Sequence, residues 1–231
     1  MALVVGLDGD DTLWHNERLF SMTEERFRSL VAPFAAGHDL MSSLLETERR
    51  NLRLFGYGVK SFTLSMIETA IEVTGGKVPI GVVGELLEAG KQMLDHPVEL
   101  LDGVAETIPS LAGAWTLILI TKGDLFHQES KLARSGLLPH LDRVEIVSEK
   151  EPSTYRRILD AAEVDPADFV MVGDSMRSDI EAVLDVGARA IHIPGYREWA
   201  LEVSDLDGPG DGRWWRLRSI AEVPDLLATL A

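Results

Sequence analysis

LVVGLDGDDT, at residues 3–12, is the stretch that decides the fold, because a short apolar run ends there in a cluster of carboxylates. Four further apolar runs share this design, each bounded by polar or turn residues, at 117–120, 144–147, 169–172 and 190–193. Continuous apolar runs of this length are typical of strands that are buried on both faces. They therefore predict a parallel sheet with helices on either side.

Helix-like segments separate the later runs, at residues 125–137, 152–162 and 180–186. Glycine closes or follows two of these segments, as is common where a helix stops in a left-handed turn. Strands and helices that alternate in this way predict an α/β fold with a doubly wound parallel sheet. Towards the C-terminus we expect a surface loop at 205–212, an edge strand within 214–220 and a final helix at 224–230.

About 100 residues separate the first apolar run from the second, which is far too many for one crossover connection. Apolar residues recur in this segment at helical spacing, and glycine-containing breakers divide it into several helices. We interpret residues 15–95 as an inserted α-helical subdomain, and residues 1–14 and 96–231 as the catalytic core.

Ligands of an open α/β sheet bind beyond the carboxyl ends of its strands, so the residues that follow the apolar runs are the candidate site. These residues are Asp8, Asp10, Thr121, Lys122, Gly123, Lys150, Asp174 and Asp179. Clustered carboxylates repel one another, and their pKa values rise unless a cation lies between them. Oxygen ligands in a chain without cysteine favour a hard ion, so the pattern predicts Mg²⁺ as the cofactor.

Such a set of side chains suits phosphoryl transfer, which needs a nucleophile, neutralised phosphoryl oxygens and a proton for the leaving group. Asp8 can serve as the nucleophile through an acyl phosphate that water later hydrolyses. Asp10 is placed to protonate the leaving oxygen and then to deprotonate the water. Thr121, its neighbouring backbone N–H groups and Lys150 can hold the remaining phosphoryl oxygens. Lys122 can either add a positive charge near the phosphate or point into solvent.

The amino-acid composition excludes several classes of binding partner and of catalytic site. Hydrophobic residues make up 45% of the 231 residues, enough for a sizeable core, and the formal net charge is −16, which argues against binding nucleic acid. The absence of cysteine excludes disulfides, thiolate zinc sites and cysteine nucleophiles. No apolar run approaches the roughly 18 residues of a membrane span, and the N-terminus lacks the pattern of a signal peptide. We therefore expect a cytoplasmic protein with a small soluble substrate.

The motifs together resemble the haloacid dehalogenase superfamily. Its first motif, an apolar strand followed by D-x-D-x-T, is matched by residues 8–12, and its second, a Ser or Thr closing the next core strand, by Thr121. Its third, a later lysine, is matched by Lys150, and its fourth, a pair such as G-D-x-x-x-x-D, by residues 173–179. The four occur in family order over residues 3–194, which makes the resemblance specific.

The resemblance implies a role for each residue. Asp8 would be the nucleophile and Asp10 the general acid and base. Asp8, the backbone carbonyl of Asp10 and Asp174 would bind Mg²⁺, with Asp179 acting from behind them. Thr12 would brace the catalytic loop by hydrogen bonding. The inserted helices, placed just after the first motif, match the family's helical type of cap, which closes over the core and contacts the substrate.

Asp10 also separates the chemistries within this superfamily. Members that remove halide carry no carboxylate two residues after the nucleophile, since halide needs no proton, so we expect a phosphatase rather than a dehalogenase. A phosphomutase or another phosphotransferase shares the first half-reaction and stays open. A non-catalytic phospho-switch such as a receiver domain fits less well, because it places its aspartate on a middle strand and has no long helical insertion after the first strand.

Overall fold

The structure, a computed structural model, describes residues 3–197, 199–202 and 212–230. Of the surface loop expected at 205–212, only Gly212 falls within these ranges, and the rest of that prediction lies outside the described residues. No helix in the described ranges combines the length and apolar character that crossing a membrane requires.

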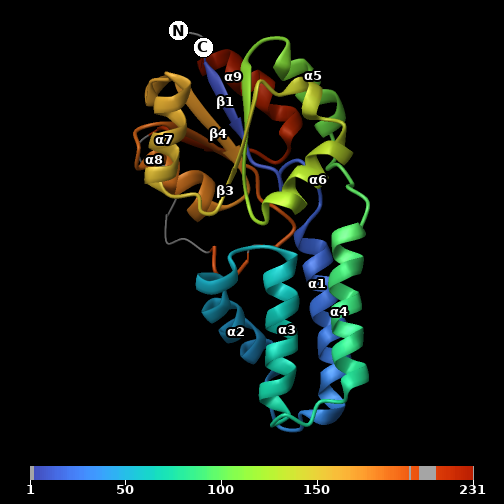
Figure 1. The fold of residues 1–231 in the computed structure, drawn as a ribbon. Helices are drawn as coiled ribbons and strands as arrows, with labels where there is room; N and C mark the ends of the chain where they lie inside the picture. Colours follow the sequence, from blue (N-terminus) through green and yellow to red (C-terminus); the bar gives the residue numbers. More distant parts are fainter. Residues whose placement is uncertain (1–2, 198, 203–211, 231) are drawn as a thin grey trace. The chain divides into compact units, whose positions relative to one another are not determined.

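Parallel strands form one 6-stranded sheet in the order β3-β2-β1-β4-β5-β6 (Figure 1). The predicted doubly wound α/β fold is therefore confirmed. The chain runs outward from β1 to β2 and β3, then returns to β4 on the other side of β1, so the strand order switches at β1. Ligands of such sheets bind at this switch point. The strands are β1 (Val4–Leu7), β2 (Thr116–Lys122), β3 (Arg143–Val147), β4 (Phe169–Gly173), β5 (Arg189–His192) and β6 (Trp214–Arg216).

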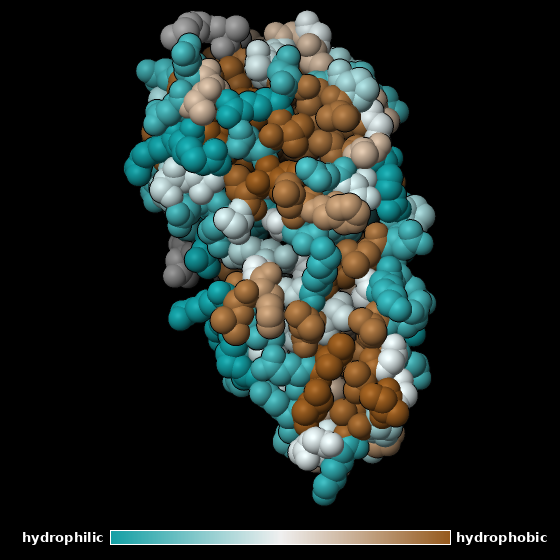
Figure 2. All heavy atoms as spheres, viewed as in Figure 1, coloured by the Kyte–Doolittle hydropathy of each residue, from teal (hydrophilic) through white to brown (hydrophobic). Residues whose placement is uncertain are grey.

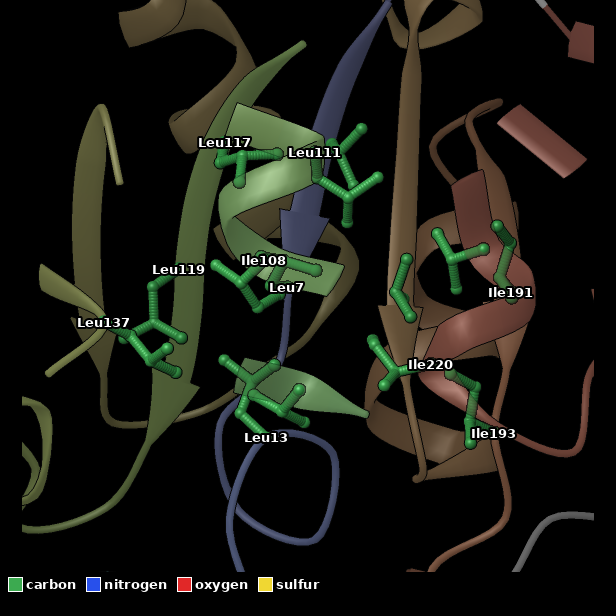
Figure 3. Packing of buried hydrophobic residues seen from close by; sticks show 14 of the residues in the cluster. Leu7, Leu13, Ile108, Leu111, Leu117, Leu119, Leu137, Ile191, Ile193 and Ile220 are labelled. Carbon is green, nitrogen blue, oxygen red and sulfur yellow. The ribbon is translucent and has the colours of Figure 1, made fainter. Parts of the chain in front are cut away.

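Successive side chains of each strand point to opposite faces of the sheet, and helices cover both faces. Val5 and Leu7 pack in one apolar cluster with Ile108 and Leu111, whereas Val4 packs in a second cluster on the other face. Figure 3 shows the first cluster, with Leu7 of β1 beside Ile108 of the helix that precedes β2. The first cluster includes residues of α5 (Val104–Ala112), α6 (Leu125–Ser135) and α9 (Val223–Leu230), and the second residues of α7 (Pro152–Ala162) and α8 (Ala182–Leu184).

Two helices depart from the sequence prediction. Helix α5 was not anticipated, because Pro109 inside it ordinarily breaks a helix. The apolar face of this helix, with Val104, Ile108 and Leu111, packs in the first cluster and stabilises the helix despite the proline. The helix predicted at 180–186 begins earlier, because a widened π-type helical turn, Met176–Glu181, follows β4 and leads into α8. That earlier start matters, since it moves Asp179 from a loop into a helical turn directly after β4.

Gly6 in β1 gives the first testable prediction, because nothing larger fits there. A Cβ atom at this position would lie 2.4 Å from Cζ of Phe169 and 2.8 Å from Sδ of Met171, both in the neighbouring strand β4. We expect Gly6→Ala to lower the free energy of unfolding by about 1–3 kcal/mol through overpacking. Urea denaturation measures this, with Gly84→Ala as the control, since a Cβ there meets nothing within 4 Å. Equal stability of the two variants would contradict the prediction.

The chain divides into two compact units. Met1–Glu17 together with Val98–Ala231 form one, which we call the core unit, and Arg18–Pro97 form the other, which we call the helical unit. The helical unit contains helices that enclose an apolar core of their own, with Phe27, Leu44, Met66 and Leu86 among its buried side chains. These helices are α1 (Glu17–Val31), α2 (Leu40–Phe55), α3 (Val59–Val73) and α4 (Ile80–Asp95).

The helical unit also exposes apolar side chains, including Leu64, Ile71, Ile80 and Leu87 of α3 and α4. Figure 2 shows brown, hydrophobic side chains gathered over this unit on the face in view. Exposed apolar patches on a folded protein often mark contact surfaces.

Candidate active site

The loop after β1 holds the two carboxylates of the first motif in fixed positions. The Asp8 N–H donates to the Val172 carbonyl oxygen at 2.9 Å, which extends the pairing of β1 with β4 by one residue. The loop then folds back, and the N–H groups of Leu13 and Trp14 both donate to the Gly9 carbonyl oxygen, at 2.8 and 3.2 Å. Asp8 therefore lies at the carboxyl end of β1, the strand at which the sheet order switches.

Asp11 turns this loop towards the first helix. Its φ of 58° lies in the left-handed region, which Asp tolerates better than most residues. Its carboxylate accepts hydrogen bonds from the N–H groups of Asn16, at 3.1 Å, and Glu17, at 2.8 Å. Burial, followed by the neighbouring charge of Asp10, raises the pKa of Asp11 to about 6. A carboxylate thus satisfies backbone donors at the start of α1.

Three carboxylates converge at the switch point. One carboxylate oxygen each of Asp8, Asp174 and Asp179 lie within 4.8 Å of one another. Asp174 directly follows β4, and Asp179 comes from the helical turn after it. Gly173 permits this approach, because a Cβ atom there would lie 2.3 Å from the Asp179 carboxyl carbon. The structure therefore brings together the acidic residues of the first and fourth motifs.

Lys150 lies within this acidic cluster and is only 4% exposed. Its ammonium group donates to Oδ1 of Asp8 and, at 2.7 Å, to Oδ1 of Asp179. Burial lowers the pKa of Lys150, but Asp179 and Asp8 outweigh burial, so the pKa lies well above its usual value. Tyr155 supports the far side of the cluster, where its hydroxyl donates to the Ser178 carbonyl oxygen at 2.9 Å. Lys150 is thus a fixed cation beside Asp8.

One lysine does not offset three carboxylates. Burial raises the pKa of Asp8 from 3.8 to about 7, against the lowering effect of Lys150, and Asp179 and Asp10 add to the rise. Burial, followed by the charges of Asp8 and Asp179, raises the pKa of Asp174 well above its usual value. Buried carboxylates that resist ionisation favour a cation between them. A donor set made only of oxygens fits a hard divalent ion such as Mg²⁺.

Asp10 has a different environment from Asp8, although only one residue separates them. Its Oδ1 accepts from the Trp14 indole N–H at 2.5 Å and from the Lys131 ammonium at 2.7 Å, and its Oδ2 from the Gln128 amide at 3.1 Å. Burial raises the pKa of Asp10, but Lys131, Trp14 and Gln128 together outweigh burial and lower it. The pKa values of the two carboxylates of the first motif therefore shift in opposite directions, and Asp10 is the more readily ionised.

Thr121 is the penultimate residue of β2 and lies beside this loop. It is buried, and its Oγ1 accepts a hydrogen bond from the Gln128 amide at 2.8 Å. Gly9 lies against it, since a Cβ atom on Gly9 would lie 3.3 Å from Thr121 Oγ1 and 2.7 Å from the Trp14 ring. The loop after β1 and the end of β2 are therefore adjacent, as the sequence motifs predict.

Two predicted phosphate contacts, Lys122 and Gly123, have other partners in the structure. The Lys122 ammonium donates to Glu202 and, at 2.9 Å, to the Ser178 hydroxyl, so carboxylate and hydroxyl groups already engage its charge. The Gly123 N–H donates to the Val147 carbonyl oxygen at 3.3 Å, which continues the pairing of β2 with β3. In this conformation other groups of the protein engage both of them, and their contact with phosphate stays a prediction.

The brace expected from Thr12 is also absent. Its side chain is buried, and its hydroxyl has no hydrogen-bond partner within the described residues. Hydrogen bonds between backbone groups close the loop instead, as the contacts of Gly9 with Leu13 and Trp14 show. Backbone pairing fixes this loop without the side chain that the motif assigns to the task.

Sequence reasoning missed several residues that complete the site: Trp14, Gln128, Lys131 and Glu202. Gln128 and Lys131 stand three residues apart on α6, so they share one face of that helix. This helix follows Thr121 in the chain. The available signal in the sequence was the spacing of its polar residues Gln128 and Lys131, which places both on one helix face close to Thr121. Glu202 gave none, because it lies far along the chain from Ser175 and Lys122 and meets them only in the folded protein.

Residues 3–187 match the family model for haloacid dehalogenase-like hydrolases. The chain belongs to this family. A solved structure of a haloacid dehalogenase-like family hydrolase from Xanthomonas campestris is 40% identical, with a TM-score of 0.89 over 99% of this chain and 91% of that one. The resemblance predicted from the motifs is thereby confirmed.

Two further comparisons bear on chemistry and fold. N-acylneuraminate-9-phosphatase of Mus musculus is 31% identical over 102 residues, which span 42% of this chain and 41% of that relative. The match thus covers less than half of this haloacid dehalogenase-like chain and of the curated relative. A 2-haloacid dehalogenase from Pseudomonas syringae is 23% identical over 100% of both chains, with a TM-score of 0.66, and shows a shared fold.

Proposed function

We propose that this protein is a Mg²⁺-dependent phosphomonoesterase that hydrolyses a small phosphorylated metabolite through a phosphorylated Asp8. The observation that carries the proposal is the pair of carboxylates after β1. Asp8 is buried against Lys150 and next to Asp174, whereas Asp10, two residues later, is held by separate donors. A carboxylate nucleophile with a second carboxylate nearby meets the needs of stepwise phosphoryl transfer.

The proposed reaction has two steps. In the first, a carboxylate oxygen of Asp8 attacks phosphorus, the bond from phosphorus to the leaving oxygen breaks, and Asp10 gives that oxygen a proton. In the second, Asp10 takes a proton from water, and the resulting hydroxide attacks phosphorus and releases Asp8 and inorganic phosphate. Three donors favour the ionised form of Asp10 in the free protein, so a proton must reach Asp10 when the substrate binds.

The metal ligands that we propose are Asp8, the backbone carbonyl of Asp10, and Asp174. Bound there, Mg²⁺ would neutralise phosphoryl oxygens and reduce their repulsion by Asp8. Asp179 has a supporting place, because its Oδ1 accepts from Lys150 at 2.7 Å and its Oδ2 from the Ser175 N–H at 3.2 Å. Asp179 would orient Lys150 and partly neutralise its positive charge.

Phosphoryl oxygens need donors besides the metal. Thr121 supplies a hydroxyl and Lys150 a buried ammonium group. Within the described residues, the N–H groups of Gly9 and Asp10 make no hydrogen bond, which leaves two backbone donors beside Asp8. Such fixed donors stabilise charge that develops on transferred oxygens.

The position of Asp10 supports phosphate over halide chemistry, because a leaving halide needs no proton. The name of the mouse relative supports the same branch of the family. We further propose that the helical unit acts as the cap over the substrate and that the protein works in the cytoplasm.

A panel of phosphate monoesters tests the proposal. We expect release of inorganic phosphate from an aryl phosphate and from at least one member of a panel of sugar, nucleoside and sugar-acid phosphates, including N-acylneuraminate 9-phosphate. Release should require added Mg²⁺ and stop with a chelator. Failure on every phosphate with Mg²⁺ present, by a folded protein, would contradict the proposal. Transfer of the phosphoryl group to a second substrate in place of water would favour a phosphotransferase.

Mg²⁺ binding itself should depend on pH. The pKa of Asp8 is raised from 3.8 to about 7 in the folded protein, so protons compete with the metal below about pH 7. We expect the affinity for Mg²⁺ to increase as the pH rises through this range, by up to about tenfold per unit for each proton displaced. Thermal unfolding with and without Mg²⁺ at pH 5.5 and pH 8 checks this, with about 3 kcal/mol of stabilisation expected at 100 times the dissociation constant. A shift that does not depend on pH would contradict it.

A further inference from the structure

Helix α6 contributes two polar side chains to the carboxylate of Asp10. The Lys131 ammonium donates to Asp10 Oδ1 at 2.7 Å and to the Asn16 side-chain oxygen at 2.8 Å. The Gln128 amide nitrogen lies 3.1 Å from Asp10 Oδ2, 2.8 Å from Thr121 Oγ1 and 3.0 Å from the Lys122 carbonyl oxygen. Both side chains are buried. They belong to none of the four family motifs that the sequence shows.

These contacts fix the orientation of the carboxylate and not only its position. Trp14 and Lys131 hold Oδ1, and Gln128 holds Oδ2 from a separate direction. Rotation of the carboxyl group would break all three hydrogen bonds at once. The Gln128 amide group has two hydrogens, which three acceptors share. Because two of these acceptors are Asp10 Oδ2 and Thr121 Oγ1, Gln128 also links Asp10 to the end of β2.

A buried lysine needs a reason in physical terms. An apolar side chain of similar length would fill the same space on α6 without the cost of taking an ammonium group out of water. The Lys131 ammonium group donates hydrogen bonds to two residues of the loop after β1, Asp10 and Asn16. A general acid must reach the reacting atom within hydrogen-bond distance, and a displacement of about 1 Å can cost on the order of 10²-fold in rate.

We propose that Lys131, with Gln128 beside it, is a positioning residue that aims the carboxylate of Asp10 at the oxygen of the leaving group. The proposal rests on the proposed function and deepens it. Lys131 does not touch the phosphoryl group; it acts through Asp10. Its importance therefore follows the need of the substrate for a proton. Poor leaving groups such as alcohols need that proton, and a good leaving group such as a nitrophenolate hardly does.

The test compares kcat/KM on an alkyl phosphate and on p-nitrophenyl phosphate at saturating Mg²⁺. We expect Lys131→Met, which keeps the length and apolar stem of the side chain, to reduce kcat/KM by on the order of 10²-fold on the alkyl phosphate. On the aryl phosphate the reduction should be at least about tenfold smaller. Asp10→Asn should show the same dependence on the leaving group, and adding Lys131→Met to Asp10→Asn should cost little more.

Each outcome decides something. Equal losses on the two phosphates, no loss on either, or a full additional loss in the double variant overturns the inference and leaves the proposed function standing. A wild-type protein that hydrolyses neither phosphate overturns the proposed function and the inference together. If Lys131→Met does not fold, Gln128→Met replaces it, and the same dependence on the leaving group is the expected result. Melting temperatures of all variants separate loss of fold from loss of positioning.

Discussion

Asp8→Asn should reduce phosphate release by on the order of 10⁴-fold or more, because an amide cannot form the acyl phosphate through which we propose the reaction runs. The change is nearly isosteric, and the Asn carbonyl oxygen can still accept a hydrogen bond from Lys150. Asp179 also remains as a partner for Lys150. Loss of activity should therefore occur without loss of the fold. Phosphate release at saturating Mg²⁺ and circular dichroism measure the two effects.

The stability of this variant can be predicted in sign. The pKa of Asp8 is raised in the folded protein, so ionising it costs the folded state free energy as the pH rises from 3.8 towards about 7. Asparagine removes this cost. Without Mg²⁺ at pH 8, Asp8→Asn should be at least as stable as the wild type, and Mg²⁺ should stabilise it less. Asp160→Asn, at an exposed position of α7, is the control and should change neither activity nor stability. Activity near the wild-type level in Asp8→Asn would refute the assigned nucleophile.

Lys150→Met should destabilise the protein strongly, by about 3–5 kcal/mol at pH 8, because it leaves buried carboxylates without their cation. The Lys150 ammonium donates to Asp8 and to Asp179, both buried. Without it, repulsion within the cluster would raise the pKa values of Asp8 and Asp174 further. Phosphate release should also fall sharply, since the variant loses both the donor that we propose for the phosphoryl group and the orientation of Asp8.

The destabilisation should depend on pH and on metal. Acids whose folded pKa is raised lose stability as the pH rises, so Lys150→Met should be closer to the wild type at pH 5 than at pH 8. Mg²⁺ should restore part of the loss by supplying another cation. Urea denaturation at both pH values, with and without Mg²⁺, provides the measurement. Lys91→Met, at an exposed ion pair with Glu88, is the control and should stay within about 0.5 kcal/mol. Equal destabilisation at both pH values would show that packing, not charge, explains the effect of Lys150→Met.

Where the sequence prediction succeeded, the pattern was local. Five apolar runs became β1 to β5, because continuous hydrophobicity over four or five residues favours strands that are buried in a sheet. The helix predicted at 152–162 matches α7, since Pro152 can begin a helix and the apolar residues of that segment recur on one face. The prediction missed helix α5, because Pro109 disfavours a helix in the local sequence whereas packing against the sheet stabilises one.

The candidate site, like the fold, could be predicted from the sequence only where the pattern was local. The sequence indicated that Asp8, Thr121 and Asp174 follow strands of one parallel sheet, which brings them to one edge of that sheet. It could not indicate which donors each would meet. Lys122 follows Thr121 directly but pairs with Glu202, 80 residues later in the chain. The N–H of Gly123, which we predicted to contact phosphate, extends the strand pairing in this structure.

The sequence by itself determined which segments form the strands β1 to β5, the placing of Asp8 at the end of the first strand and the family to which the chain belongs, because each depends on residues close together in the chain. Only the tertiary structure decided that the pKa values of the two carboxylates after β1 shift in opposite directions. Asp8 lies among other buried carboxylates, and its pKa is raised to about 7, whereas Lys131 and Gln128 of α6 keep the pKa of Asp10 low. The physical reason is that burial and nearby charges set a pKa. Gln128 and Lys131 stand 118 and 121 positions after Asp10 in the chain, so they meet its carboxylate only when the chain folds.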